Sequence, residues 1–105
     1  GYAVNPDNIQ AQLQGSVVHG LTAIFWGEMT VKDGRIEQSN FHDYRMMRMN
    51  EMPKVETYIV PSTAAPTGIG EPAVPPVAPA VVNAIANATQ KWLTQLPLKT
   101  ELLKV

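Results

Sequence analysis

Cysteine is absent from this chain of 105 residues. Disulfide bonds, iron–sulfur ligation and thiol catalysis are therefore excluded from within the sequence given, because each needs a cysteine sulfur. The same absence leaves the cellular compartment open. A chain of this length holds one domain at most and one modest hydrophobic core, so we expect a single domain over residues 1–105.

The chain also lacks a large excess of positive or negative charge. Eight Lys and Arg residues stand against nine Asp and Glu residues, which gives a formal net charge of −1. The basic residues form no run and no basic amphipathic helix, so we expect neither a nucleic-acid partner nor a basic membrane-binding surface. No apolar run has the length needed to span a bilayer, and residues 1–6 lack the basic and apolar regions of a signal peptide. We therefore expect no membrane span.

The first helix is predicted from a capping signal and a regular apolar stripe. Residues 5–7 read Asn-Pro-Asp, a favourable helix start, and the helix is predicted to end near residues 25–26. Gly15 and Gly20 lie inside it, where glycine weakens a helix, so we expect close backbone packing there. The apolar stripe recurs at steps of three and four: Ile9, Leu13, Val17, Leu21 and Ile24.

Several strands are predicted before the second helix. Residues 28–32 and 35–38 flank Asp33-Gly34, a strong local signal for a hairpin. Residues 41–49 are a candidate third strand, and residues 55–60 alternate and are rich in strand-forming residues. The second helix is predicted to begin near residues 75–76 and to end before Pro97. This order predicts an α+β fold with two helices packed on a small, mostly antiparallel three- to four-stranded sheet.

A glycine turn at residues 67–72 carries the main candidate for chemistry. Glu71 follows Gly68 and Gly70, which can take positive φ and let other groups approach the backbone closely. Enzymes hold a general base on a short shaped loop of this kind. A solvent-exposed structural acid is the alternative interpretation, because a short glycine motif is weak evidence by itself.

The remaining candidate residues favour structural interpretations. His19 lies one step from the apolar stripe, which favours a packed or half-exposed helix residue over a ligand. His42 is typical of a turn residue beside Asp43. The spacing of the two histidines and nearby acids matches no standard metal site, so no metal ligand is predicted. Adaptable packing, or alternatively a partner or substrate surface, is predicted for the methionine cluster: Met46, Met47, Met49 and Met52.

Four stretches together resemble a known family. They are residues 12–21 (QLQGSVVHGL), 38–44 (QSNFHDY), 48–56 (RMNEMPKVE) and 68–85, which contain GIGEP and PPVAPAVVNAI. Over roughly residues 5–97 their order and spacing resemble the C-terminal part of the molybdopterin-binding subunit of the xanthine oxidase and aldehyde oxidoreductase family. Within that family the chain resembles the branch of the isoquinoline 1-oxidoreductase beta subunit and bacterial aldehyde dehydrogenases.

The resemblance implies a specific chemistry. Enzymes of this family use a molybdenum–pterin cofactor to hydroxylate aldehydes or N-heterocycles with oxygen from water. Glu71 matches the position of the family's general base, which would take a proton from that oxygen. By the same resemblance, the backbone of Gly68, Ile69 and Gly70 would lie close to the metal site.

The resemblance also implies what the chain needs from elsewhere. The family's cofactor-embracing loops lie upstream, outside the sequence given, so we expect the isolated chain to be inactive and not to bind the cofactor alone. The implied partners are the upstream molybdenum-binding portion and an iron–sulfur subunit, and exposed apolar surface should favour homo-oligomers. The alternative is a stand-alone binding or structural module that kept the fold and lost the cofactor site.

One departure from the family pattern concerns the end of the second helix. Gln90 stands where relatives usually have a helix-ending glycine, and Trp92 and Thr94 stand where basic residues are common. The departure puts the usual helix stop in doubt.

Overall fold

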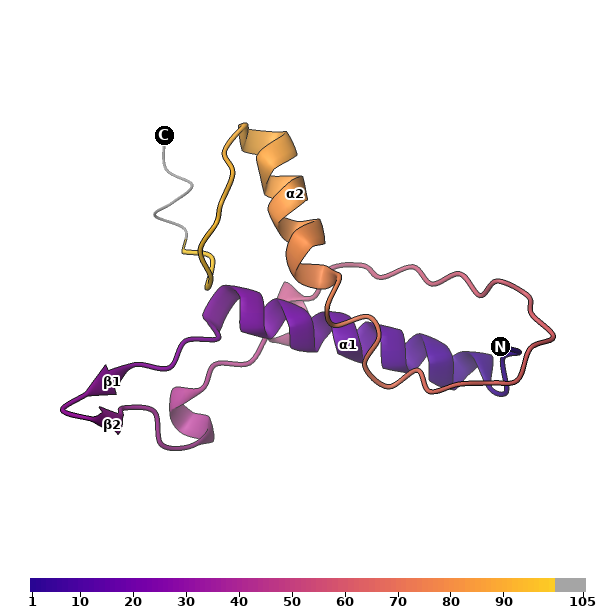
Figure 1. Cartoon of the computed structure of the whole chain (residues 1–105), viewed down its shortest axis with the longest axis horizontal. Coiled ribbons are helices and arrows are strands. Elements are labelled where there is room, and N and C mark those ends of the chain that lie inside the picture. Colours follow the sequence, from indigo (N-terminus) through magenta and orange to yellow (C-terminus); the bar gives the residue numbers. More distant parts are fainter. Residues whose placement is uncertain (100–105) are drawn as a thin grey trace.

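The computed structural model describes residues 1–99, and its longest element is the helix α1, Pro6–Trp26 (Figure 1). The side chain of Asn5 accepts a hydrogen bond from the backbone N–H of Asn8 at 3.1 Å, and Pro6 occupies the first turn. The helix ends at Gly27, whose N–H donates back to a carbonyl of the last turn. The predicted start and end of this helix are confirmed.

The second helix, α2, Val77–Thr89, packs against α1 (Figure 1). A Cβ atom added to Gly20 would lie 3.0 Å from the Cβ of buried Val77, so the close approach depends on the missing side chain. At Gly15 an added Cβ would meet no atom within 4 Å. The close packing predicted at both glycines is therefore confirmed only at Gly20.

The hydrophobic core lies where α1, α2 and the segment after α2 meet. Its buried members are Leu21 and Ile24 of α1, Val77 of α2, and Leu98. The backbone N–H of Leu98 donates to the carbonyl of Ile24 at 2.7 Å, which ties this last segment to the end of α1. The core is small, because it contains few fully buried side chains among the described residues.

The end of α2 retains a regular helix stop without glycine. Gln90 adopts the left-handed conformation with φ 59° and ψ 20°, and its N–H donates to the carbonyl of Ala86 at 2.8 Å. Glycine is favoured at such a position because a Cβ atom is crowded there. The doubt raised by the sequence is resolved: the residue differs from the family pattern, and the helix still stops at it.

A short hairpin follows α1 and extends away from the helices (Figure 1). Its strands are β1, Val31–Lys32, and β2, Arg35–Ile36, which pair in antiparallel register. The turn residues Asp33 and Gly34 both have positive φ, at 50° and 75°, as a tight two-residue hairpin requires. The predicted hairpin is confirmed, although its strands are shorter than expected.

The third strand predicted at residues 41–49 is wrong. This region forms two single-turn 3₁₀ helices, η1, Phe41–Asp43, and η2, Met49–Glu51. In each turn the third residue is an acid whose side chain accepts a hydrogen bond from the backbone N–H of the capping residue. Side chains that satisfy the backbone locally compete with strand pairing, and here they prevail.

Residues 55–60 are not in a helix and make no backbone hydrogen bond to another described residue. Their side chains include Tyr58, which is 82% exposed. The described residues therefore contain one two-stranded antiparallel sheet, and the fold is α+β in character. The predicted three- to four-stranded sheet is not confirmed, and the helices pack on each other rather than across a broad sheet.

The molecule is elongated for its length. Its radius of gyration is 17.0 Å, whereas a compact chain of this size has about 13 Å. Its accessible surface is 8165 Å², against about 5,800 Å² expected for a compact monomer of this mass. Large apolar side chains lie in this surface, including Phe41, Met49 at 96% exposure and Trp92 at 73%. Much apolar area thus remains open to further protein.

Neither helix within residues 1–99 has the combination of length and sustained hydropathy that a bilayer crossing requires.

We expect the two glycines of α1 to respond oppositely to alanine. Gly20→Ala should lower the free energy of unfolding by about 1–3 kcal/mol, because Val77 must move to admit the methyl group. Gly15→Ala is the matched control and should raise it by about 0.5–1 kcal/mol, since alanine favours the helix and the space is open. Urea unfolding followed by circular dichroism measures both. Equal effects would contradict the close α1–α2 contact.

The left-handed residue at the end of α2 gives a second prediction. Gln90→Gly should raise the free energy of unfolding by about 0.4–1 kcal/mol, because glycine adopts this conformation without the Cβ penalty. Gln90→Ala removes the same amide and keeps the Cβ, so it should bring no gain. Thermal unfolding of both variants tests the conformation, and a gain from alanine equal to that from glycine would argue against it.

Candidate functional site

The turn that carries Glu71 lies against the middle of α1. The Ser16 hydroxyl donates a hydrogen bond to the carbonyl oxygen of Gly70 at 3.1 Å. On the other side of the acid, the backbone N–H of Val74 donates to the carbonyl of Glu71 at 2.9 Å. These two bonds hold the main chain before and after Glu71.

The carboxylate of Glu71 is exposed and free. Among residues 1–99 it makes no recorded hydrogen bond or ion pair. The acid therefore combines a restrained main chain with an unengaged side chain. That combination suits a group that must meet a proton donated by another molecule.

A cavity of about 440 Å³ lies between α1 and this turn. Glu71 also borders a second hollow, which Gly68 and Gly70 line with it. Both hollows are open to solvent on this chain, so the described residues form walls rather than an enclosed chamber. The residues that line the first cavity are Gln12, Gly15, Ser16 and His19 of α1, and Gly70, Glu71, Pro72, Val74 and Pro75 of the turn.

The predicted site residues lie together in part. Gly68, Gly70 and Glu71 border the hollows, whereas Ile69 is half-buried and lines neither. Gly34 is the one glycine with positive φ among residues 1–99, so the expected left-handed freedom of Gly68 and Gly70 is not used. An added Cβ at either glycine would meet no atom within 4 Å. Their contribution is an accessible backbone.

Sequence reasoning missed the helical wall of the cavity. Gln12, Ser16 and His19 lie on α1 at steps of four and three, which places them on one helical face. His19 was interpreted as a packed or half-exposed residue; the structure shows it exposed at the cavity edge. The signal for this wall was a polar stripe beside the apolar one.

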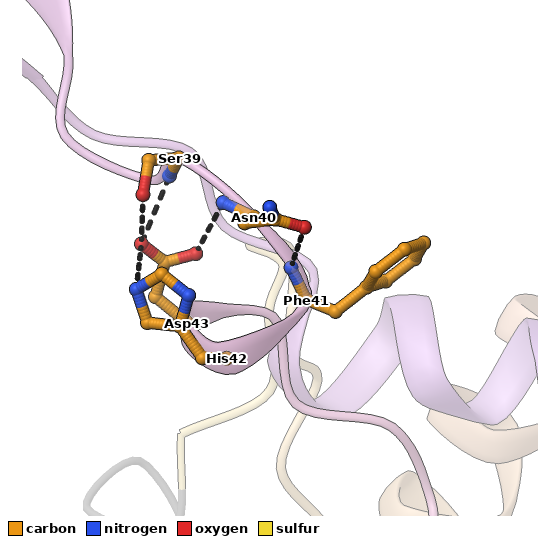
Figure 2. A network of polar contacts seen from close by, with 5 residues as sticks. All are labelled: Ser39, Asn40, Phe41, His42 and Asp43. Carbon is orange, nitrogen blue, oxygen red and sulfur yellow. Dashed lines mark hydrogen bonds and ion pairs between the residues drawn. The ribbon is translucent and has the colours of Figure 1, made fainter.

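The second histidine belongs to a capping network (Figure 2). Asp43 accepts hydrogen bonds from the N–H of Ser39 at 2.9 Å, the hydroxyl of Ser39 at 3.1 Å and the N–H of Asn40 at 3.0 Å. His42 lies beside it, with Nε2 at 3.5 Å from the carboxylate. The backbone donors at Asn40 and Ser39 hold the pKa of Asp43 below its ordinary value of 3.8. His42 is therefore the turn residue that the sequence predicted.

A metal site does not arise from this network. Within residues 1–99 no group of three or more His, Cys, Asp or Glu residues is placed to hold a metal ion.

The methionines do not form one surface. The backbone N–H of Met47 donates to the hydroxyl of Thr22 at 3.1 Å, and its side chain packs against the core. Met46 and Met49 are exposed, whereas Met52 is half-buried. Met47 therefore serves packing, which is one of the two alternatives predicted for the cluster.

The comparison with protein families is decisive at this point. Residues 1–53 match the model of the molybdopterin cofactor-binding domain. The chain belongs to this family. The match ends before the glycine turn, so the family assignment does not depend on Glu71.

Individual relatives of this family cover the chain more fully. The isoquinoline 1-oxidoreductase subunit beta of Brevundimonas diminuta is 32% identical over 105 residues, which is 100% of this chain and 13% of the relative. A membrane-bound aldehyde dehydrogenase of Gluconacetobacter polyoxogenes is 32% identical over 99 residues, 94% of this chain and 13% of the relative. The predicted resemblance to these two branches is confirmed.

A third relative has molybdenum in its name. The putative xanthine dehydrogenase molybdenum-binding subunit of Escherichia coli (strain K12) is 32% identical over 105 residues, covering 93% of this chain and 14% of the relative. The chain thus spans only 13–14% of the length of these curated relatives. Several relatives carry the word subunit in their names, which indicates assemblies of more than one chain.

The cavity has a size and a lining that suit contact with part of an organic molecule. Its volume of about 440 Å³ lies within the range of roughly 300–1,000 Å³ that is usual for small-molecule sites. Gly68 and Gly70 offer accessible backbone, and Gln12 supplies an amide on the facing wall. These groups suit polar contacts with an organic molecule rather than direct ligation of a metal ion.

The capping network predicts a local pH dependence. The pKa of Asp43 is depressed in the folded chain, so its stabilising contribution is present above 3.8 and is lost as pH falls below that value. Carbon-13 NMR should show a carboxyl titration with its midpoint below 3.8. The protection of the Ser39 and Asn40 amides from hydrogen exchange, relative to an unstructured chain at the same pH, should fall as the proton binds. In Asp43→Asn that pH-dependent loss of protection should disappear; a midpoint at or above 3.8 would contradict the network.

Proposed function

We propose that this chain supplies the C-terminal part of a molybdenum-cofactor subunit that oxidises an aldehyde or N-heterocycle with oxygen from water. Glu71 acts as the general base. The observation that supports this role is an unengaged carboxylate on a main chain restrained from both sides, at the edge of an open cavity. Family membership supplies the class of chemistry.

Each part of the turn has a distinct task in this proposal. When bound, the molybdenum–pterin group accepts two electrons from the substrate. Glu71 receives a proton at a carboxylate oxygen, and the backbone of Gly68, Ile69 and Gly70 lies close to the group. Carboxylates serve as bases when they are held within hydrogen-bond distance of the proton they remove.

The isolated chain is inactive in this proposal, because its cavity is open. Base catalysis by a carboxylate is more effective where water is excluded and neighbouring dipoles are fixed. The described residues supply one side of such a site, and the chain spans 13% of the length of its relatives. The upstream molybdenum-binding portion supplies the other side.

In the assembled subunit, the proposal also includes a sheet with more strands than the two of the hairpin. Residues 55–60 lack backbone partners among the described residues and alternate in the manner of a strand. An exposed strand of this composition readily pairs with another sheet edge. Pairing with the upstream portion makes residues 55–60 a third strand, whereas residues 41–49 form 3₁₀ turns and add none.

Two further associations belong to the proposal. An iron–sulfur subunit, which the resemblance to the family implies, removes the electrons. Without its larger partner, the chain self-associates through its exposed apolar side chains, such as Phe41 and Trp92.

Co-expression with the upstream portion of a related subunit tests the proposal. The assembly should retain molybdenum and pterin and should reduce a dye in the presence of an aldehyde. Glu71→Gln should lower kcat by about 10²–10⁴-fold with cofactor content unchanged, because only the base is removed.

The matched control is Glu28→Gln, which removes an exposed acid paired with Lys99 at 3.2 Å, and it should retain activity. Full activity in Glu71→Gln would contradict the role of Glu71. A folded chain that never retains molybdenum or pterin would instead indicate a binding module that has lost the cofactor site.

A further inference from the structure

Among the described residues, one side-chain hydrogen bond holds the turn that carries Glu71 against α1, and we infer that its donor, Ser16, is a positioning residue for Glu71. Ser16 lies in the middle of α1 and is only 5% exposed. Its hydroxyl donates to the carbonyl oxygen of Gly70, 54 residues later, at 3.1 Å. The role of Glu71 as base rests on the proposed function, whereas the restraint on the turn rests on this geometry alone.

Ser16 uses its hydroxyl differently from other hydroxyl residues of these helices. A serine or threonine inside a helix commonly donates to the carbonyl four residues earlier. Thr22 does so to Val18 at 2.8 Å, and Thr89 does so to Ile85 at 2.8 Å. Ser16 instead directs its donor out of α1 and toward the turn.

Sterics do not hold Gly70 in place. Glycine has no side chain, and an added Cβ at Gly70 would meet no atom within 4 Å. A glycine in open space has wide backbone freedom. Among the described residues, the hydrogen bond from Ser16 is what restrains the Gly70 carbonyl. Because the peptide unit is planar, a fixed Gly70 carbonyl also fixes the direction of the Glu71 N–H.

The peptide on the other side of Glu71 is restrained independently. Its carbonyl oxygen accepts from Val74 N–H at 2.9 Å. Both peptide planes that flank Glu71 are thus held while the carboxylate stays unengaged. Loss of the Ser16 bond releases one plane and spreads the positions that the carboxylate reaches. A base must lie within about 2.6–3.2 Å of its proton, and a displacement of about 1 Å can lower a rate by on the order of 100-fold.

Backbone dynamics of the full 105-residue chain test the restraint without any cofactor. Ser16→Ala removes the donor, Ser16→Cys nearly keeps the volume with a weak donor, and Ser16→Thr keeps the hydroxyl. The nitrogen-15 order parameters of Gly70 and Glu71 should fall from about 0.85 to below about 0.6 in Ser16→Ala. The order parameters should fall by a smaller amount in Ser16→Cys, and in Ser16→Thr they should stay near those of the unchanged chain. Thr89→Ala, which removes a helical hydroxyl far from the turn, should leave them unchanged.

Unchanged order parameters in both Ser16→Ala and Ser16→Cys would overturn the inference. If Ser16→Ala does not fold, the near-isosteric Ser16→Cys decides the question, since it preserves packing.

Kinetics of the co-expressed assembly test the consequence for catalysis. Ser16→Ala should lower kcat by about 10- to 100-fold, with KM within about twofold and cofactor content unchanged, because positioning acts on the reacting geometry. Ser16→Thr should restore kcat. A Ser16→Ala enzyme with full kcat would overturn the positioning role. An assembly with no activity in any variant would overturn the proposed function, and the order parameters would still decide whether Ser16 holds the turn.

Discussion

The close contact between Gly20 and Val77 determines where the other elements of this structure lie. Because α1 has no side chain at residue 20, the first residue of α2 reaches the helix surface. Val77 follows Glu71 by only six residues, so fixing it also fixes the course of the glycine turn beside α1. The cavity, its two walls and the hydrogen bond from Ser16 all depend on that course. A glycine that weakens α1 locally thus organises the candidate site.

Sequence signals within a few residues of each other predicted the elements that depend on short-range contacts. Helix α1 and the hairpin follow from a cap, an apolar stripe and an Asp-Gly turn, and all three are present. Residues 41–49 were mispredicted because Asp43 and Glu51 satisfy nearby backbone donors, which the apolar pattern does not reveal. The glycine turn was recognisable from its sequence. Its helical wall was not, because Ser16 and Gly70 come together only through the packing of α2 on α1.

The long-range order of the chain depends on a few hydrogen bonds to α1. Ser16 holds the glycine turn, buried Thr22 accepts from the N–H of Met47, and the carbonyl of Ile24 accepts from Leu98. Each bond connects α1 to a different distant segment. The core is small, and each distant segment is tied to α1 by one of these hydrogen bonds, so much apolar surface stays uncovered. This exposure agrees with a chain that spans 13–14% of its relatives' length.

The main chain of Glu71 and its carboxylate are controlled by different parts of the assembly in the proposed function. The direction of the Glu71 main chain is set from within, by α1 on one side and by the following turn on the other. The environment of its carboxylate is set from outside, because the described residues leave both adjoining hollows open. Orientation requires short, local contacts, whereas exclusion of water requires enclosing walls. In the proposed function, the chain therefore orients Glu71, and the larger subunit supplies the walls that exclude water from it.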